Sequence, residues 1–387
     1  MRGFVVFSDN WGAHPSSCQH LFRRIVAGHP VIWVNTVMRW PRLSAADLAK
    51  VAGKLRGWLA PARAPAAGPA PLVLNPVLWP GWGLAPERRL NARRIAGALA
   101  APMAGRDVER WVLLTTIPVV ADVFDAFPAA AKVYYCVDEY AEWPGHGKDV
   151  MTAQEARLLE RVDLVVATSR HLQRRKARPG RATELLTHGV DVAHFAGGHG
   201  GKARLAKMGV DPARRVVGFF GLLDERIDPD LVIAVARARP DDVFLFVGPR
   251  AADMGRLEAA PNVRLLPPVP YAELPCLASG FDVAWLPYRI NALTVNIHPL
   301  KLKEYLALGC PVLSTPLPEV ADLAGHVTVA AGADACAAAL AAWAQAPPSP
   351  SEATRAFVRS QSWEAKAAQL LAWIDALDAA PAGEGAR

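Results

Sequence analysis

Short apolar segments of strand type alternate with helical segments along the chain, and this alternation begins twice. The first series opens with residues 4–8, which are rich in β-branched and aromatic side chains. It passes through a glycine-containing turn into a helix over residues 16–27 and a strand at residues 31–35. The second series opens with a strand and a glycine turn at residues 216–221. Because strand–helix–strand units build parallel sheets, the sequence predicts an α/β fold with two doubly wound, Rossmann-like domains.

The segment 296–315 is the most informative candidate site. It predicts a loop, a helix that starts at Pro299 and stops at Gly309, and then a short buried strand. Lys301 lies in the first helical turn, where free backbone amides and the helix dipole favour a phosphate. Glu304 lies three residues later on much the same face, and its carboxylate suits the hydroxyls of a ribose. One short element could therefore hold both parts of a nucleotide, although an ordinary amphipathic helix with solvated lysines explains the same pattern.

This segment also resembles a known signature. Its pattern Pro-x-Lys-x-x-Glu-Tyr-x-Ala-x-Gly-x-Pro-Val is similar to the donor-binding signature of GT-B glycosyltransferases near the large retaining family four. The resemblance implies two Rossmann-like domains that face a cleft, with the last helix crossing back to the first domain. It also implies that Glu304 binds the donor ribose, whereas the family's second Glu, eight residues earlier, is Asn296 here. The donor-binding residues expected on this basis are Gly221, Arg226, Asn296, His298, Pro299, Leu300, Lys301 and Glu304.

The loop after residues 216–221 supports the same interpretation. Glycines there would let the backbone approach a phosphate, and Arg226 could pair with it. The loop resembles the first loop of the GT-B donor domain, which usually carries an Arg and a Lys for the diphosphate. Leu222 occupies the place of the family's Arg. We therefore expect Arg226 to substitute for one of the two cations.

Two features of the first half predict an acceptor side. Trp11 and Gly12 follow the first strand in a turn that resembles the cleft-facing loop of GT-B enzymes, with an ordinary turn glycine as the alternative. The strand at residues 132–137 ends at Asp138, on the carboxyl edge where α/β folds place their chemistry. Residues 133–145 resemble a segment of bacterial polysaccharide glycosyltransferases related to teichuronic-acid biosynthesis enzymes. We expect Asp138 to orient or deprotonate the acceptor hydroxyl, with capping of the next turn as the alternative.

The expected organisation, in chain order, is an acceptor-side domain over residues 1–195 with a mobile basic insertion at 46–71, a linker at 196–210, a donor domain over 211–362, a crossover helix at 363–378 and a disordered tail at 379–387. Within the insertion, residues 47–59 combine lysines, an arginine and a tryptophan at helical spacing. This pattern is typical of helices that lie on anionic membrane surfaces, and packing on the chain's own domain explains it about as well.

Composition excludes several other classes of protein. The chain of 387 residues is 52% hydrophobic and 20% charged, so that it can bury sizeable cores. No apolar run is long enough to span a membrane, and the N-terminus turns polar too early for a signal peptide. Five scattered cysteines lack metal-ligand spacing and fit free thiols in a reducing cytoplasm. The net charge of +7 favours anionic partners, but no alternation of basic and aromatic residues indicates nucleic acid.

These features together predict a hexosyltransferase-type glycosyltransferase in the cytoplasm, peripheral on the inner face of the plasma membrane. It would move a sugar from a nucleoside diphosphate sugar to a hydroxyl of a glycan or lipid-linked acceptor, in cell-surface polysaccharide biosynthesis. Asp138 and Lys301 are the expected catalytic residues. No DxD-type metal motif is present, so we expect Lys301, Arg226 and helix amides to neutralise the diphosphate, without a metal or cofactor. The alternatives are a sugar-nucleotide epimerase of the same fold and a catalytically silent partner in polysaccharide assembly.

Overall fold

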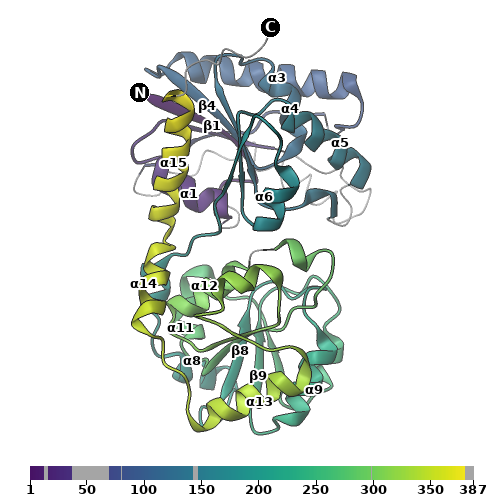
Figure 1. Cartoon of the computed structure of the whole chain (residues 1–387), viewed down its shortest axis with the longest axis vertical. Coiled ribbons are helices and arrows are strands. Elements are labelled where there is room, and N and C mark those ends of the chain that lie inside the picture. The colour runs from purple at the N-terminus through teal and green to yellow at the C-terminus, as the bar shows by residue number, and fades with distance from the viewer. Residues whose placement is uncertain (13–15, 37–68, 80, 143–146, 298, 380–387) are drawn as a thin grey trace. The chain divides into compact units, whose positions relative to one another are not determined.

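The computed structural model describes residues 1–379 apart from 13–15, 37–68, 80, 143–146 and 298. The chain divides into two compact units (Figure 1). The first unit comprises Met1–Leu186 and Ala367–Arg387, and the second comprises Thr187–Lys366. Each unit has its own parallel sheet and its own hydrophobic core. No helix in the described part of the chain is both long and apolar enough to cross a membrane.

The first unit is built on a parallel sheet of seven strands. Their order is β3-β2-β1-β4-β5-β6-β7, so the direction of winding reverses between β1 and β4. Helices cover both faces of such a sheet, which explains why β1 buries six of its seven residues. The strands are β1 (Arg2–Ser8), β2 (Val31–Asn35), β3 (Leu72–Leu74), β4 (Arg110–Thr115), β5 (Ala131–Cys136), β6 (Leu164–Ala167) and β7 (Ala182–Leu185).

The helices of the first unit lie on the two faces of this sheet. Helices α3, α4 and α5 pack side by side on one face (Figure 1), where Val5 and Phe7 of β1 join Ile95 of α3 in the core. On the other face, Phe4 contacts Phe22 of α1 edge to face, with ring centroids 5.5 Å apart. The helices are α1 (Ser17–Ile25), α3 (Ala85–Ala104), α4 (Ala121–Phe124), α5 (Lys148–Leu159), α6 (Arg170–Lys176) and most of α15 (Trp363–Ala379).

The second unit repeats this plan with a parallel sheet of six strands. Their order is β10-β9-β8-β11-β12-β13, and the winding reverses between β8 and β11. Strands β8 and β9 are buried along their whole length. The strands are β8 (Val216–Phe220), β9 (Val243–Val247), β10 (Val263–Leu266), β11 (Val283–Leu286), β12 (Val312–Ser314) and β13 (Thr328–Val329).

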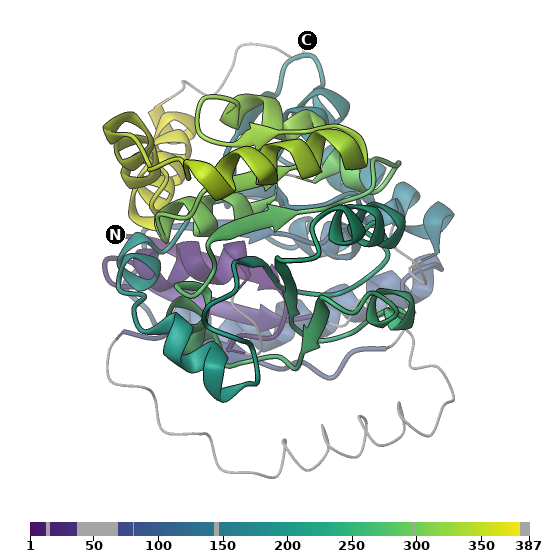
Figure 2. The ribbon, with the colours of Figure 1, turned by 90° about the horizontal axis from the view of Figure 1, so that it is seen from below.

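Two groups of helices accompany the second sheet. Helix α9 packs against both α10 and α13, and Figure 2 shows α13 in yellow-green, lying across the strands. Helices α7, α8, α11, α12 and α14 are linked by mutual contacts into a second group. The helices are α7 (Val192–Ala196), α8 (Gly201–Lys207), α9 (Pro229–Ala238), α10 (Gly255–Glu258), α11 (Leu274–Ala278), α12 (Leu300–Ala307), α13 (Gly332–Gln345) and α14 (Glu352–Ser360).

Helix α12 has the boundaries that its sequence predicts to within one residue. Pro299 is the N-cap instead of the first helical residue. At the other end, Gly309 has a φ of +78°, and its N–H donates to the carbonyl of Leu306 at 3.0 Å. The N–H of Cys310 donates to the carbonyl of Tyr305 at 3.2 Å, which completes a Schellman cap. Glycine stops this helix because it adopts the left-handed conformation without steric cost.

The predicted fold class, two Rossmann-like doubly wound domains, is confirmed. The structure differs from the expected linker at residues 196–210, because α8 lies within that range and buries Leu205 completely. Gly201 owes its presence to close packing and not to flexibility, since a β-carbon there would meet the backbone of Gly280 at 2.0 Å. The units divide after Leu186, nine residues before the expected boundary. Most of the expected insertion at 46–71 and the tail from residue 380 lie outside the described residues.

Candidate functional site

The reversal of strand order in the second sheet marks a candidate site. In open α/β sheets, ligands bind outside the carboxyl ends of the strands at such a reversal. Gly221 directly follows β8, and Tyr288 lies two residues beyond β11. The chain then continues from β11 into α12, so the first turn of α12, with Lys301, begins at this same edge of the sheet. The structure thus brings Gly221 and Lys301 together as the sequence predicts.

The side chain of Lys301 lies directly against Gly221. A β-carbon at position 221 would lie 2.0 Å from Lys301 Cε and 2.8 Å from Nζ, and Gly221 has a φ of +134°. The Lys301 ammonium donates to the hydroxyl of Tyr288 at 3.4 Å and lies 5.6 Å from the ring centre of Phe219. It forms no ion pair with any described residue. Two aromatic rings and a glycine therefore hold a cation at the switch point, and its charge also acts on the carboxylate of Glu304.

Glu304 lies one turn further along α12. Its residue is 9% exposed, and within the described residues its carboxylate accepts no hydrogen bond. Burial raises its pKa to about 7, and the charge of Lys301 acts in the opposite direction. The oxygens of Glu304 are not among the fully buried atoms that lack a partner, so they are within reach of solvent or a ligand. Glu304 is consequently suited to accept hydrogen bonds from a ligand.

Arg226, in the loop after β8, lies close to the ring of Tyr288. Its guanidinium carbon is 5.5 Å from the Tyr288 ring centre, while Lys301 Nζ is 6.0 Å from it. The guanidinium also forms an ion pair with Asp224, with Nη2 and Oδ2 2.7 Å apart. Arg226 thus shares the Tyr288 ring with Lys301, and Asp224 already offsets part of its charge. Its expected pairing with a diphosphate stays a prediction.

The remaining predicted donor residues precede or begin α12. Asn296 ends the 3-10 turn η4 (Thr294–Asn296), and its side chain lies outside the described part, as does the whole of His298. Pro299 is buried, and Leu300 is the first helical residue. No described side chain caps the first turn of α12. The N–H of Leu302 already donates to the carbonyl of Pro299 at 3.2 Å, so the amides of Leu300 and Lys301 are the ones without a described acceptor. Binding of an anionic group there stays a prediction.

The first unit has its own switch point, between β1 and β4. The hydroxyls of Ser8 and Thr116, at the ends of these strands, lie 2.8 Å apart. Asp9 follows β1, and its carboxylate accepts hydrogen bonds from Ser16 at 3.0 Å and from Gln19 at 2.9 Å. Asp9 is a polar group at the carboxyl edge that the sequence interpretation did not single out. Its position directly after an apolar strand was the available signal.

The Trp11–Gly12 turn is held by side chains of its own unit. The N–H of Trp11 donates to Asn35 Oδ1 at 3.0 Å, and the N–H of Gly12 donates to Gln19 Oε1 at 2.9 Å. Gly12 has a φ of +79°, which a glycine adopts without strain. The Trp11 ring packs against Trp33, with centroids 4.7 Å apart. Both amides of the expected acceptor-side loop are thus already hydrogen-bonded.

The Asp-Glu pair after β5 has two different roles. Asp138 Oδ1 accepts a hydrogen bond from the backbone N–H of Glu139 at 3.0 Å, a contact with the adjacent residue that does not cap the turn at residues 140–142. Glu139 is buried, and the ammonium of Lys176 donates to both of its oxygens at 3.0 and 2.9 Å. Lys176 also donates to Glu155 at 2.6 Å. Glu139 therefore anchors the segment that carries Asp138.

Lys303 is the second lysine near the start of α12, where the sequence predicts two lysines beside a phosphate, and the structure corrects this expectation because Lys303 is engaged elsewhere. It is 1% exposed, and its ammonium donates to Thr187 Oγ1 at 3.0 Å, to the carbonyl of His188 at 2.5 Å and to Gln361 Oε1 at 2.9 Å. Burial lowers its pKa well below the ordinary value, and Lys366 acts in the same direction. The amphipathic pattern of the sequence predicts a solvated face for Lys303. The residues that cover it, Thr187, His188 and Gln361, are distant in the sequence, so the pattern could not indicate its burial.

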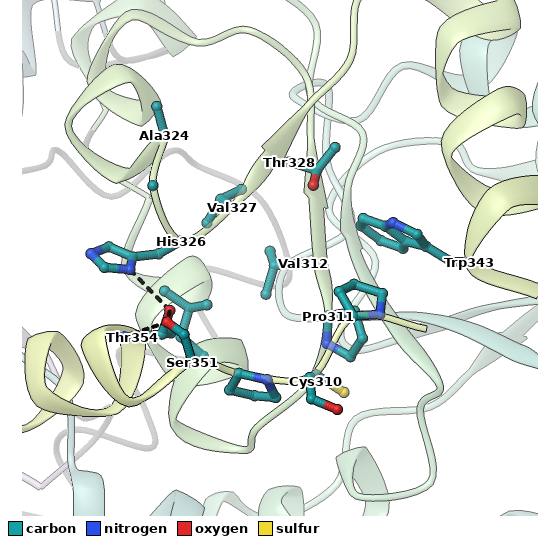
Figure 3. Close-up of a pocket in the computed structure, with 15 residues that line it drawn as sticks. Cys310, Pro311, Val312, Ala324, His326, Val327, Thr328, Trp343, Ser351 and Thr354 are labelled. Carbon is teal, nitrogen blue, oxygen red and sulfur yellow. Dashed lines mark hydrogen bonds between the residues drawn. The ribbon is translucent and has the colours of Figure 1, made fainter. Parts of the chain in front are cut away.

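A separate cavity of about 240 Å³ lies at the amino end of β12 (Figure 3). His326 forms one wall, with its Nδ1 3.0 Å from Thr354 Oγ1 and its ring stacked on Phe357. Trp343 and Cys310 also line the cavity. This cavity contains none of the predicted site residues. Among the described residues, no three His, Cys, Asp or Glu side chains gather so that they could hold a metal ion.

Comparison with known families supports the assignment of the second unit. Residues 214–346 match the family model described as "Glycosyl transferases group 1". The chain is 27% identical over 237 residues to a Bacillus subtilis protein proposed to be the teichuronic acid biosynthesis glycosyltransferase TuaH, covering 57% of this chain and 59% of that protein. It is 30% identical over 248 residues to a D-inositol 3-phosphate glycosyltransferase of Segniliparus rotundus, covering 56% and 53%. The chain thus spans somewhat more than half the length of these curated relatives.

Solved structures share the fold at low sequence identity. A sucrose-phosphate synthase from Thermosynechococcus elongatus aligns with a TM-score of 0.68 at 16% identity, covering 98% of this chain and all of that one. HepE of Anabaena, in complex with UDP and glucose, aligns with a TM-score of 0.66 at 13% identity over 97% of this chain and all of that one. Two parallel Rossmann-like sheets and these similarities show that the fold is that of GT-B glycosyltransferases.

Proposed function

We propose that this chain, whose residues 214–346 form a Glycosyl transferases group 1 domain, transfers a sugar from a nucleoside diphosphate sugar to a hydroxyl group. The acceptor would be a glycan or a lipid-linked sugar in cell-surface polysaccharide biosynthesis. The observation that carries this proposal is the placement on α12 of the cation Lys301, which has no close ion pair with a described residue, one turn before the largely buried carboxylate Glu304, which accepts no hydrogen bond from the described residues. The relative named for teichuronic acid biosynthesis and the neighbour that holds UDP and glucose support it.

The chemistry follows from where charge develops. When the bond between the sugar and the diphosphate breaks, negative charge grows on the leaving diphosphate. Lys301 and the open amides of α12 are preorganised to stabilise that negative charge. Arg226 contributes to the stabilisation when its guanidinium shifts from the ion pair with Asp224 toward the diphosphate. We assign ribose binding to Glu304, since a carboxylate with free lone pairs accepts from hydroxyl groups. In this proposal neither a metal nor a further cofactor is required.

We assign the orientation or deprotonation of the acceptor hydroxyl to Asp138. Its backbone is fixed by the buried contact between Glu139 and Lys176, and such preorganisation is what a general base needs. A carboxylate accepts several hydrogen bonds at once, so the amide contact at Asp138 Oδ1 is compatible with this role. Retention of configuration is the stereochemical outcome that the family resemblance implies, and Asn296 would then stand at the donor sugar.

We also propose a cytoplasmic location on the inner face of the plasma membrane. The expected contact is the basic amphipathic segment at residues 47–59, which lies outside the described residues. Lipid-linked acceptors would be presented at such a surface.

The direct test is release of the nucleoside diphosphate. The wild-type chain would be incubated with UDP-, GDP-, ADP- and dTDP-sugars and a panel of glycan and polyprenyl-linked acceptors, beside Glu304→Gln and Asp138→Asn. We expect acceptor-dependent release with one donor class, lost in both variants. Binding without release of nucleoside diphosphate under any condition would favour the silent partner, and interconversion of free sugar nucleotides would favour the epimerase.

A further inference from the structure

Asp9 lies at the point where the strand order of the first sheet reverses, and no step of the proposed reaction uses it. The residue directly follows β1, and β1 and β4 are the two strands between which the order reverses. In open α/β sheets, ligands bind outside the carboxyl ends of the strands at such a reversal. Asp9 is therefore located where the first unit is best suited to bind a ligand.

Three hydrogen bonds fix the Asp9 carboxylate. Its Oδ1 accepts from the hydroxyls of Ser8 at 2.9 Å and Ser16 at 3.0 Å, and its Oδ2 accepts from Gln19 Nε2 at 2.9 Å. The backbone is held as well, because the indole N–H of Trp33 donates to the Asp9 carbonyl at 2.8 Å. A side chain held in this way is preorganised, so it loses little conformational freedom when it binds a ligand.

The Asp9 carboxylate keeps one acceptor position for a ligand. A carboxylate offers about four lone-pair positions, and the described residues occupy two on Oδ1 and one on Oδ2. Asp9 is exposed, so a ligand can reach the remaining position. All three donors are neutral, and no described lysine, arginine or histidine forms an ion pair with Asp9. Asp9 thus offers a charged acceptor to a hydroxyl group at the edge of the sheet.

A chain of hydroxyl groups links Asp9 to the segment that carries Asp138. Thr116 Oγ1 lies 2.8 Å from Ser8 Oγ, and because Ser8 uses its only hydroxyl proton for Asp9, Thr116 donates to Ser8. Thr116 also forms a hydrogen bond with the hydroxyl of Tyr140, two residues after Asp138. Burial raises the pKa of the Tyr140 hydroxyl well above its ordinary value, and the charges of Asp138 and Asp9 act in the same direction. Both carboxylates therefore lie near the Tyr140 hydroxyl.

We propose that Asp9 is a second acceptor-binding residue, which accepts a hydrogen bond from a hydroxyl of the acceptor sugar that does not react, while Asp138 takes the hydroxyl that does. This inference rests on the proposed function and adds to it the class of acceptor. Neighbouring hydroxyls of one sugar can donate to two nearby carboxylates, whereas both carboxylates repel an acidic group on the same ring. The acceptor sugar is therefore neutral, and Asp9 contributes to this specificity.

The test measures the binding of methyl glycosides to the full chain by saturation-transfer NMR, which needs no turnover. The probes are the methyl glycosides of glucose, galactose and mannose and those of the corresponding uronic acids. Wild type should bind at least one neutral glycoside and exclude its uronic acid counterpart. Asp9→Asn should weaken the binding of that neutral glycoside about tenfold, because a hydrogen bond to a charged group is lost. It should also increase the affinity for the uronic acid, because one of two repelling charges is removed.

Two further variants separate this role from support of the loop after β1. Asp107→Asn removes the same charge from an exposed position before β4, at the amino edge of the sheet, and should behave as wild type. Asp9→Glu keeps the charge and displaces the carboxylate by one methylene group. It should therefore lose affinity for the neutral glycoside and still exclude the uronic acid.

Weaker binding of the neutral glycoside in Asp9→Asn, without a gain for the uronic acid, would overturn the proposal, because Asp9 would then only support the loop. Unchanged binding of both probes would overturn it as well, and so would a wild type that binds no neutral glycoside. A thermal shift with sugar nucleotides, which depends on the second unit, tests the proposed function separately. Donor binding without an effect of Asp9 would overturn the role of Asp9 alone. Selective glycoside binding that depends on Asp9, without any donor binding, would support Asp9 and contradict the sugar transfer.

Discussion

Lys301 occupies the space that a side chain at position 221 would need, since a β-carbon on Gly221 would lie 2.0 Å from Lys301 Cε. Glycine at the end of β8 is therefore the condition for a lysine on α12 to reach the switch point. The two positions are eighty residues apart in the chain, yet the residue type at one determines where the side chain of the other can lie. The positive φ of Gly221, +134°, reinforces the same requirement.

Gly221→Ala should displace the Lys301 side chain and destabilise the second unit by about 1 to 3 kcal/mol, from the backbone strain and the overlap together. Donor affinity should fall with it. Gly325→Ala is the matched control, because a β-carbon at that position meets nothing within 4 Å. Urea unfolding and calorimetric titration with the sugar nucleotide measure the two effects, and equal behaviour of the two variants would mean that the close approach has no consequence.

Lys301→Ala should lower kcat about 100-fold and raise the donor KM, because the ammonium stabilises charge that grows as the diphosphate leaves. The larger effect on kcat distinguishes this role from simple binding. Lys207→Ala removes an exposed lysine of the same unit and should leave both parameters unchanged. Steady-state kinetics with a saturating acceptor provide the measurement, and unchanged kinetics of Lys301→Ala would remove this residue from the site.

Donor affinity should depend on the ionisation of Glu304, whose pKa is about 7. The carboxylate accepts more hydrogen bonds from ribose hydroxyls than the protonated acid, so affinity should rise as pH increases through 7. In Glu304→Gln this rise should disappear. Titration calorimetry between pH 6 and about 8 tests it, with Glu225→Gln, at an exposed position, as the control. A rise that persists in Glu304→Gln would assign the titration to another group.

The same ionisation affects the stability of the unliganded protein. Burial raises the pKa of Glu304 above its ordinary 4.5, so the folded state holds the proton more tightly than the unfolded state. The stabilising contribution of the protonated form is complete below about pH 4.5 and is lost as pH rises through 7. The unfolding free energy of wild type should therefore fall relative to that of Glu304→Gln as the pH rises from acid to neutral. A difference that is constant across this range would show that Glu304 has an ordinary pKa.

Lys303 should show the opposite dependence at higher pH. Burial lowers its pKa well below 10.5, so its proton is held more tightly in the unfolded state. Stability should then rise as pH increases from the lowered pKa toward 10.5, and Lys303→Met should remove that part of the rise. Denaturant unfolding of the two proteins at successive pH values gives the comparison. Parallel curves would mean that the ammonium is not destabilised by burial.

Asp138→Asn should reduce transfer about 100-fold and leave donor affinity unchanged, because the acceptor hydroxyl loses its base while the second unit is intact. Glu139→Gln is a useful contrast, since it breaks the buried contact with Lys176 and should lower stability as well as transfer. Loss of donor affinity in Asp138→Asn would place this residue elsewhere in the reaction.

The sequence predicted what periodicity and helix signals carry directly. The strands of both sheets follow runs such as residues 216–220 and 243–247, and the ends of α12 follow Pro299 and Gly309. The common face of Lys301 and Glu304 on α12 was also predictable, because the two residues are three positions apart on a helix.

Other features depend on contacts between distant segments, which a single sequence does not encode locally. Lys303 is buried because Thr187, His188 and Gln361 cover it, and Glu139 is buried because Lys176 reaches it from another helix. The residues around Gly201 have a composition typical of a linker. In the structure, Gly201 instead permits α8 to pack closely against the backbone of Gly280. Tyr288, which lies beside both Lys301 and Arg226, has no motif that marks it.

Our central inference is that α12 binds a nucleoside diphosphate sugar through Glu304 and Lys301. The most direct measurement is a thermal-shift panel of UDP-, GDP-, ADP- and dTDP-sugars on wild type, Glu304→Ala and the control Glu225→Ala. We expect a rise in Tm with one nucleotide class in wild type and control, and none in Glu304→Ala. An equal rise in all three proteins, or no rise with any sugar nucleotide, would contradict the inference.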